Sequence, residues 1–289
     1  MPKSIRSSMQ NEIDAVGSFL TFGALFGFSP LTAFAKSSRE SLVNGVDLDT
    51  IFDKDWLAEK VVFKPGDFRR LDESDDSVFY STTRFVEHID DNAVKALTQY
   101  HREMITNLYK ERQHPLQVLD LASSWTSHIP TDLVGSGLPV SKVVGIGMNS
   151  VEMKANPVLL GDNASFVIDL NKPSGPKAIL NSLQETKFDI ALLQLSIDYL
   201  IRPVEVLSMV SKVMRPNSPL IITFSNRIFI DKAVSIWTGK DDVDHCDTVG
   251  TYMKESQGYM MPPSAKVLVQ RDKGKDPLYA VTAFTNKKR

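Results

Sequence analysis

The chain of 289 residues has one cysteine, almost no charge imbalance and no internal repeat or low-complexity tract. Cys246 alone cannot form an internal disulfide, and no Cys/His cluster has the spacing of a zinc site. A formal net charge of −2 gives no general reason to expect a nucleic acid as partner. The apolar content of 42% is ordinary for a globular protein. The sequence therefore predicts a fold that is held together by its core, without a metal.

The first 41 residues differ in pattern from the rest. Lys3 and Arg6 precede an apolar run over residues 16–28, which Ser29-Pro30 ends, and small residues follow up to Ala35. This layout is typical of a secretory-type signal. The run is short for a membrane span, which needs roughly 20 apolar residues. We expect residues 1–41 to be a targeting leader, and no stable membrane span to remain after its removal.

The Ser-rich segment after Ala35 leaves two targeting routes open. One is a thylakoid-type signal cleaved after Ala35, which leads to the thylakoid lumen. The other resembles the plastid pre-sequences of algae with secondary plastids, cut before Phe34. Both predict a plastid (chloroplast) protein. The alternative is an amphipathic or buried first helix in a cytoplasmic protein.

Residues 42–113 form a mixed lead-in that ends in a predicted helix. Good N-cap residues stand at 90–92, and apolar side chains then recur at three- and four-residue steps until about Tyr109. Tyr80, Arg84 and His88 precede this helix. They either form a wall over a pocket or pack and cap locally. The second role is favoured for His88 and left open for the other two.

Residues 114–289 alternate predicted strands and helices, which implies a parallel sheet with right-handed crossovers. Pro203 marks the first turn of one helix. The last two apolar runs lack an intervening helix and predict an antiparallel pair. The predicted strands are 115–122, 142–147, 164–170, 188–195, 219–224, 265–271 and 277–285.

The strand sequences 118–121, 143–146, 188–193 and 213–222 resemble class I S-adenosylmethionine (SAM) methyltransferases of the type 11 group. More narrowly, 120–128, 144–149 and 224–227 resemble a branch of that group found in photosynthetic organisms and bacteria. The resemblance covers residues 114–289. It implies an α/β, Rossmann-like SAM methyltransferase fold. Its seven-stranded sheet is mostly parallel and closes with a C-terminal antiparallel hairpin.

The resemblance also implies where SAM binds, at the carboxyl ends of the strands. Asp120 would accept from the ammonium, Asn149 would bind one ribose hydroxyl, and Met148 would pack on the adenine. Asp169 and Leu170 match the adenine-binding position, and the end of the fourth strand matches the wall near the sulfonium. The implied cofactor-binding residues are Asp120, Leu121, Ala122, Ser123, Ser124, Met148, Asn149, Asp169, Leu170, Gln194 and Leu195.

Two positions depart from the family pattern. Ala122-Ser-Ser replaces the usual Gly-x-Gly of the first loop, where glycine allows positive φ. Gly147 stands near the place of the acidic residue that normally binds the ribose. Both departures bear on whether SAM binding persists.

The function implied is transfer of a methyl group from SAM to an unknown acceptor by in-line displacement. No catalytic residue is assigned; Asp198, Tyr199 and Arg227 either face the substrate or cap and pack the next helix. The alternative is a non-catalytic methyltransferase-like binding or assembly factor in an organelle. A nicotinamide oxidoreductase is disfavoured, because no Gly-x-Gly-x-x-Gly follows the first strand.

Overall fold

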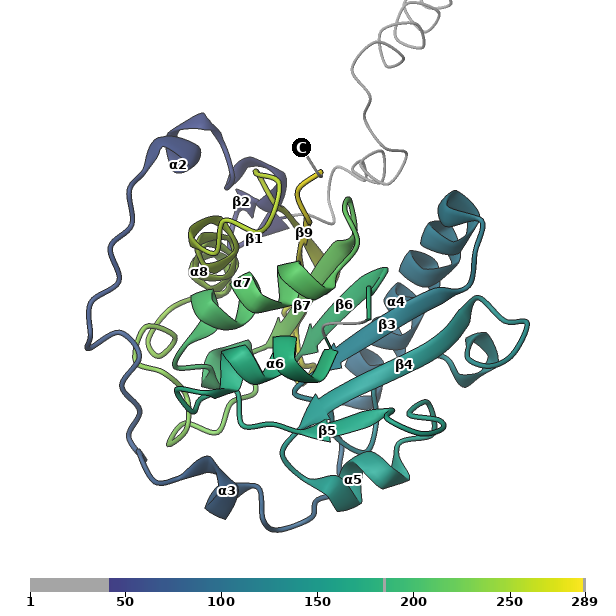
Figure 1. Cartoon of the computed structure of the whole chain (residues 1–289). Helices are drawn as coiled ribbons and strands as arrows, with labels where there is room; N and C mark the ends of the chain where they lie inside the picture. Colours follow the sequence, from purple (N-terminus) through teal and green to yellow (C-terminus); the bar gives the residue numbers. More distant parts are fainter. Residues whose placement is uncertain (1–41, 184–185, 288–289) are drawn as a thin grey trace, which may run out of the picture. The chain divides into compact units, whose positions relative to one another are not determined.

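A seven-stranded sheet forms the centre of the protein in a computed structural model, which describes residues 42–183 and 186–287. The strand order is β5-β4-β3-β6-β7-β9-β8 (Figure 1). The strands from β5 to β7 are parallel, whereas β9 is antiparallel to both of its neighbours. The predicted Rossmann-like fold class, with its closing antiparallel hairpin, is therefore confirmed. The predicted leader, 1–41, lies outside the described residues.

Each strand of this sheet overlaps one that the sequence predicts. The strands are β3 (Leu116–Leu121), β4 (Val140–Gly147), β5 (Ser165–Val167), β6 (Ile190–Gln194), β7 (Pro219–Ser225), β8 (Ser264–Val269) and β9 (Leu278–Phe284). The central strands β6 and β7 are almost wholly buried, as expected for strands covered on both faces. β5 is shorter than predicted because it lies at the edge and pairs only with Gly145–Gly147 of β4.

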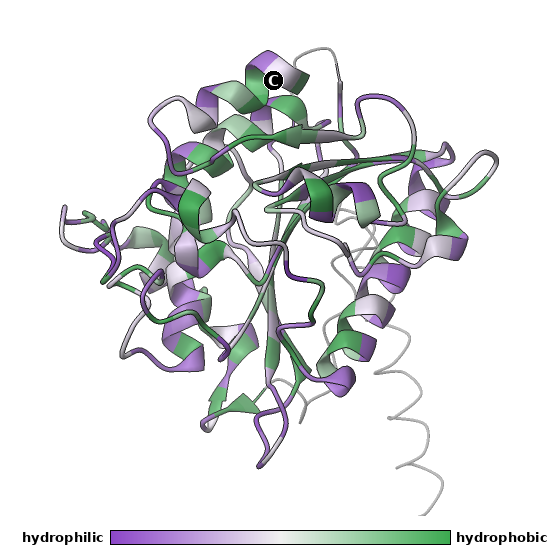
Figure 2. Ribbon diagram, turned by 90° about the horizontal axis from the view of Figure 1, so that it is seen from below, coloured by the Kyte–Doolittle hydropathy of each residue, from purple (hydrophilic) through white to green (hydrophobic). Residues whose placement is uncertain are grey.

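Helices cover both faces of the sheet. α4 (Asp91–Arg112) packs against β3 and β8 on one face, while α6 (Gly175–Leu183), α7 (Pro203–Val213) and α8 (Asp242–Glu255) cover the other (Figure 1). Figure 2 shows apolar strands in the middle and hydrophilic residues on the outer faces of the helices. This is the layered arrangement that buries one stripe of each helix.

The predicted helix boundaries hold at two of the helices. The Asp90 side chain accepts from the Ala93 N–H and begins α4, and Pro203 is in the first turn of α7. α4 runs one turn beyond the predicted end, through Lys110 and Arg112, since cations suit a helix C-terminus. It ends at Gln113, whose φ is 58°.

α6 and α8 lie in segments for which the sequence predicts no element. Apolar periodicity does not reveal α8, because polar residues such as His245, Thr248 and Thr251 are buried along with its apolar ones. Its close packing also depends on Gly250, where a Cβ atom would lie 2.3 Å from the Phe52 ring. The tertiary environment, not an apolar stripe, decides this helix.

The lead-in contributes to the same core as the Rossmann-like part. Leu48, Phe52 and Trp56 are buried in the main apolar cluster, and the Trp56 indole N–H donates to Asp247 of α8 at 2.6 Å. The predicted boundary at 113/114 stays a prediction. The remaining elements are β1 (Leu42–Val43), β2 (Val46–Asp47), η2 (Leu48–Thr50), α2 (Lys54–Ala58), α3 (Asp76–Phe79), η3 (Thr131–Leu133), α5 (Ser150–Ala155) and η4 (Ile197–Tyr199).

No helix within 42–183 and 186–287 is long and apolar enough to cross a membrane.

Candidate functional site

A pocket opens at the carboxyl ends of β3, β4, β5 and β6. The chain proceeds from β3 to one edge of the sheet and then returns to β6 on the other side, so this is the topological switch point of the fold. The predicted site residues that line the pocket are Ala122, Ser123, Ser124, Met148, Asn149, Asp169, Leu170 and Leu195. The fold therefore gathers side chains from four separate predicted segments.

Asp120, Leu121 and Gln194 lie behind this pocket instead of lining it. Asp120 is 1% exposed and accepts hydrogen bonds from Ser127 Oγ at 2.6 Å and Gln194 Nε2 at 2.9 Å. Burial raises the pKa of Asp120 to about 6. Leu121 is part of the apolar core, and the Gln194 side-chain oxygen is buried without a partner in the described part of the chain. Any ligand role for these three residues stays a prediction.

The loop after β3 adopts the conformation for which the family uses glycine. Ala122 has a φ of 53°, in the left-handed region that costs a residue with a Cβ atom about 1–2 kcal/mol. The Ser123 N–H then donates to the Ile146 carbonyl at 2.7 Å, which holds the loop against β4. Leu195, at the end of β6, has a φ of 51°. Backbone strain of this kind is concentrated at functional sites.

Gly147 has a steric reason to replace an acidic residue. A Cβ atom at this position would lie 2.0 Å from the Ser123 carbonyl oxygen and 2.9 Å from Met153 Sδ. The loop after β3 thus occupies the space that a carboxylate at 147 would need. The backbone of this loop and the Met153 side chain therefore exclude a side chain at position 147.

The Asn149 side chain is already committed to protein partners. Its Oδ1 accepts from the N–H groups of Val151 and Glu152 and so caps α5, while its Nδ2 donates to the Tyr80 carbonyl at 3.0 Å. Nδ2 also lies 3.3 Å from Thr83 Oγ1. A ribose hydroxyl would have to share or displace these bonds, so the predicted ribose role is not supported by this geometry.

Glu152 is a pocket residue that the sequence analysis missed. It lies in the first turn of α5 and is 8% exposed. Its Oε1 accepts from the Arg84 N–H at 2.7 Å, and its Oε2 accepts from Ser124 Oγ at 2.6 Å. A carboxylate has about four acceptor positions, so two remain. Its place five residues after Gly147, the expected acidic position, was the available signal.

Residues 67–90, here called the strap, form the outer wall of the pocket. Tyr80, Arg84 and His88 of the strap all line the pocket, together with Phe79. The His88 ring packs edge-to-face on Phe229 at 5.3 Å, and its exposed side chain also lines the pocket, a role that was not favoured for it from the sequence. The residues that flank His88 in the sequence, Glu87 and Ile89, do not indicate that it would line a pocket.

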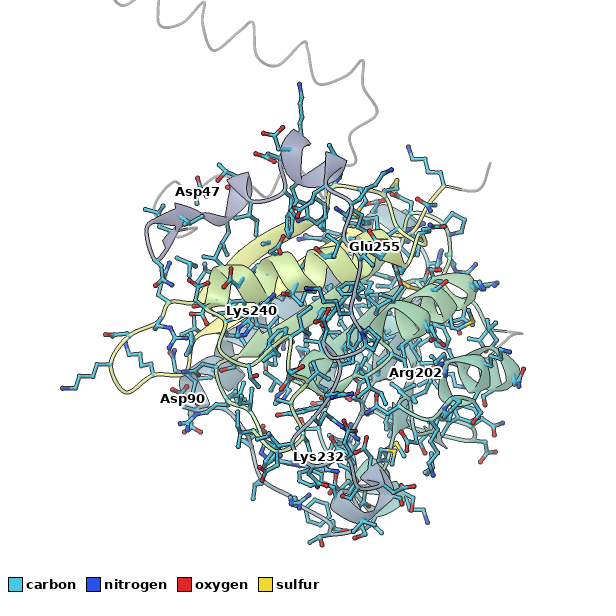
Figure 3. The ribbon with its side chains drawn as sticks, turned by 90° about the vertical axis from the view of Figure 1, so that its left-hand side faces the viewer. Asp47, Asp90, Arg202, Lys232, Lys240 and Glu255 are labelled. Atoms are coloured by element: carbon cyan, nitrogen blue, oxygen red, sulfur yellow. The ribbon has the colours of Figure 1, made fainter. Side chains whose placement is uncertain are left out.

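A buried ion cluster fastens the strap to the loops of the sheet. Arg70 donates to both carboxylate oxygens of Asp76 at 2.8 and 2.9 Å, and Lys232 Nζ lies 3.4 Å from the same carboxylate. Asn171, in the loop after β5, adds a third donor at 2.8 Å. Lys232 belongs to the loop after β7 and is labelled in Figure 3. The side chains of Arg70, Asp76 and Lys232 are all at most 5% exposed.

A second pocket adjoins the first and shares His88, Leu195, Tyr199 and Phe229 with it. Arg227 lines this second pocket as well. The Tyr199 hydroxyl accepts from the Phe229 N–H at 2.9 Å.

Asp198 lines neither pocket. It is 3% exposed, and burial raises its pKa to about 7. Of the three residues left open between substrate contact and packing, Tyr199 and Arg227 therefore face a pocket, and Asp198 packs. Among the described residues, no group of His, Cys, Asp and Glu side chains is arranged to hold a metal ion.

Comparisons with known proteins return only distant structural likenesses. No protein-family model and no curated protein matches the chain. A plantazolicin methyltransferase, BamL, solved with a desmethylplantazolicin analogue and SAH, is 14% identical, with a TM-score of 0.45 over 68% of this chain and 87% of its own. A SAM-dependent methyltransferase from Mesorhizobium loti is 13% identical, with a TM-score of 0.39 over 59% and 91%.

The [4+2]-cyclase SpnF is also similar, at 11% identity and a TM-score of 0.40 over 64% of this chain and 82% of its own. A structural likeness at this level does not identify a reaction. The strand order of the protein itself, not these scores, establishes the fold.

Proposed function

We propose that the protein binds S-adenosylmethionine in the first pocket and transfers its methyl group to an acceptor molecule. The observation that carries this proposal is the convergence of segments 122–124, 148–149 and 169–170 on one pocket at the switch point of the sheet. The resemblance to SAM methyltransferases assigns all three segments to the SAM-binding site.

The lining residues fit the parts of SAM. Ile146, Met148, Ile168 and Leu170 provide apolar surface for a flat adenine ring. Asp169 Oδ1 accepts from the Asn171 N–H at 2.9 Å, and Oδ2 has no hydrogen bond within the described part of the chain, which leaves it for the adenine amino group. Glu152 takes the role of the missing acidic residue and accepts from the ribose hydroxyls with its two free acceptor positions.

SAM, when bound, supplies a methyl group on a positively charged sulfur. The protein holds this group through the loop after β3 and excludes water with the strap. Asp120 contacts the ammonium only through a bridging water or after the Ser127 bond opens, because it does not line the pocket. We also propose that the protein is a member of the type 11 group, because its strand sequences resemble those of that group.

Calorimetry with SAM and with S-adenosylhomocysteine tests the proposal. We expect saturable binding of both, and an affinity about ten-fold lower in Glu152→Gln, since a hydrogen bond to a charged group contributes about 1.5–3 kcal/mol. Glu103→Gln, on α4 away from the pocket, is the matched control and retains wild-type affinity. Absence of binding to either compound contradicts the proposal and favours a non-catalytic binding or assembly factor.

We also propose that residues 1–41 direct the protein to the plastid. The supporting observation is the charge and apolarity pattern of the leader, with Lys3 and Arg6 before the apolar run over residues 16–28. Mass spectrometry of the native protein is expected to find a terminus between Phe34 and about Val43. A chain beginning at Ser37 is expected to be soluble, with an unchanged melting temperature. An intact Met1 terminus and a strong loss of stability on truncation would favour the cytoplasmic alternative.

A further inference from the structure

The second pocket provides information about the acceptor. It adjoins the proposed SAM pocket and shares His88, Leu195, Tyr199 and Phe229 with it, so a molecule held there lies next to the cofactor. His88 stands at the junction of the two spaces. We propose, on the basis of the proposed function, that the second pocket holds the acceptor as a flat, weakly acidic hydroxyl compound and that the His88 imidazole removes its proton.

The walls of the second pocket favour a flat molecule. The rings of Tyr199 and Phe229 lie 6.1 Å apart, and the rings of His88 and Phe229 lie 5.3 Å apart in an edge-to-face arrangement. Leu195 and Ile228 supply apolar surface between them. Aromatic and apolar walls of this kind bind conjugated rings better than flexible polar chains.

The charges around the second pocket favour a hydroxyl group over an amine. No carboxylate lines it in the described structure, whereas Arg227 does. Arg227 uses Nε to contact Asp276 at 2.7 Å, and its side chain is 63% exposed, so its terminal nitrogens are open to a ligand. An amine acceptor is a cation at neutral pH, and no carboxylate of the described lining would pair with it, because Asp276 is already paired with Arg227.

His88 is free to act as a base. Neither ring nitrogen forms a hydrogen bond or ion pair with another residue of the described chain. Partial burial and the nearby Arg84 lower the pKa of His88, against a smaller opposing effect of Glu152. Arg227 also lines the second pocket, where Asp276 pairs with its charge. The imidazole is therefore neutral at pH 7 and has a lone pair available.

The chemical step balances without another reactant. The acceptor hydroxyl gives its proton to His88, and its oxygen forms a bond to the methyl carbon. The bond between that carbon and sulfur breaks, and its electron pair stays on sulfur, which becomes a neutral thioether. The proton on His88 then passes to water. Tyr199 is unsuited as the base because its neutral hydroxyl already accepts from the Phe229 N–H, and burial raises its pKa.

The binding test uses 4-hydroxybenzoate, with benzylamine as the cationic comparison. NMR follows the imidazole signals of the full-length protein, assigned with His88→Gln, with and without S-adenosylhomocysteine. We expect 4-hydroxybenzoate to shift the His88 signals and to bind at least about ten-fold more tightly than benzylamine. His114→Gln, an exposed histidine before β3, is the matched control and leaves this binding unchanged.

The kinetic test measures methyl transfer from SAM to the same probe. His88→Gln should lower kcat about 100-fold, within the range for general-base catalysis, without changing the affinity for S-adenosylhomocysteine. It should also abolish the fall in rate at low pH. With 4-nitrophenol at pH 9, where this phenol is ionised and needs no base, the loss should be less than about ten-fold.

These experiments distinguish a failure of the proposed function from a failure of the inference about the acceptor and His88. If S-adenosylhomocysteine does not bind, the proposed function itself is wrong. If it binds but 4-hydroxybenzoate leaves the His88 signals unmoved, or if benzylamine binds more tightly, only the inference about the acceptor and His88 is overturned. An equal loss of rate with both phenols would also overturn it, because it would show that His88 holds the acceptor without accepting its proton.

Discussion

The Gln194 side-chain amide, at the end of β6, donates a 2.9 Å hydrogen bond to the Asp120 carboxylate at the end of β3. The two residues belong to neighbouring parallel strands on either side of the switch point. The sequence assigns both to the cofactor, but the structure joins them to each other behind the pocket. Asp120 therefore couples the stability of the switch point to pH.

The pKa of Asp120 predicts a specific pH dependence of stability. Burial raises it to about 6 from 3.8, so the folded protein binds a proton that the unfolded chain has released. The contribution of Asp120 to stability is therefore highest below the unfolded pKa and is lost as pH rises from about 4 to above 6. Compared with Asp120→Asn, the wild type should lose about 2–3 kcal/mol over this range in urea unfolding. Parallel pH profiles of the two proteins would contradict this.

For Asn149→Asp, the structure predicts the opposite change in SAM affinity from the one that the sequence alone predicts. A carboxylate at the ribose position should leave SAM affinity unchanged or improve it. In the structure, however, Asn149 Nδ2 donates to the Tyr80 carbonyl, and aspartate would place an acceptor against that oxygen. We expect a loss of about 1–3 kcal/mol of stability and weaker SAM binding. Asn163→Asp adds the same charge on an exposed loop and should change neither; wild-type affinity in Asn149→Asp would restore the ribose role.

Ala122→Gly tests the strain in the loop after β3. The φ of 53° at Ala122 costs about 1–2 kcal/mol, while glycine adds about 0.4–1 kcal/mol of entropy to the unfolded chain. We expect a net gain of up to about 1.5 kcal/mol in the free energy of unfolding, with SAM affinity retained. Ala191→Gly, in the extended backbone of β6, is the control and should destabilise. A loss of stability in Ala122→Gly would show that the loop is not strained.

Asp76→Asn tests how the strap is held. The substitution leaves Arg70 and Lys232 buried without their shared carboxylate, and breaking a buried pair in this way costs about 3–5 kcal/mol. We expect faster proteolysis within residues 67–90 and weaker SAM binding, since the strap forms the outer wall of the pocket. Asp75→Asn, an exposed neighbour, should have little effect. Equal proteolysis rates in the two variants would mean that other contacts hold the strap.

Much of the fold was accessible from local patterns. Nearly continuous apolar runs predicted β6 and β7. Asp90 and Pro203 predicted where two helices begin, because capping and fixed φ act within a few residues. α8 could not be predicted in this way. Its buried polar residues find hydrogen-bond partners only in the folded protein. One example is His245, whose Nε2 lies 2.9 Å from the Trp237 carbonyl oxygen.

The candidate site, like the fold, was predictable from the sequence only in part. The sequence alone determined that loops follow the parallel strands, and parallel strands bring their carboxyl ends to one edge of a sheet. Only the tertiary structure decided which side chains enter the pocket. It buried Asp120 behind the loop, excluded a side chain at Gly147, brought Glu152 to the wall and placed His88 between two pockets. These outcomes depend on contacts between segments far apart in the chain, such as Glu152 with Arg84, which no local periodicity encodes.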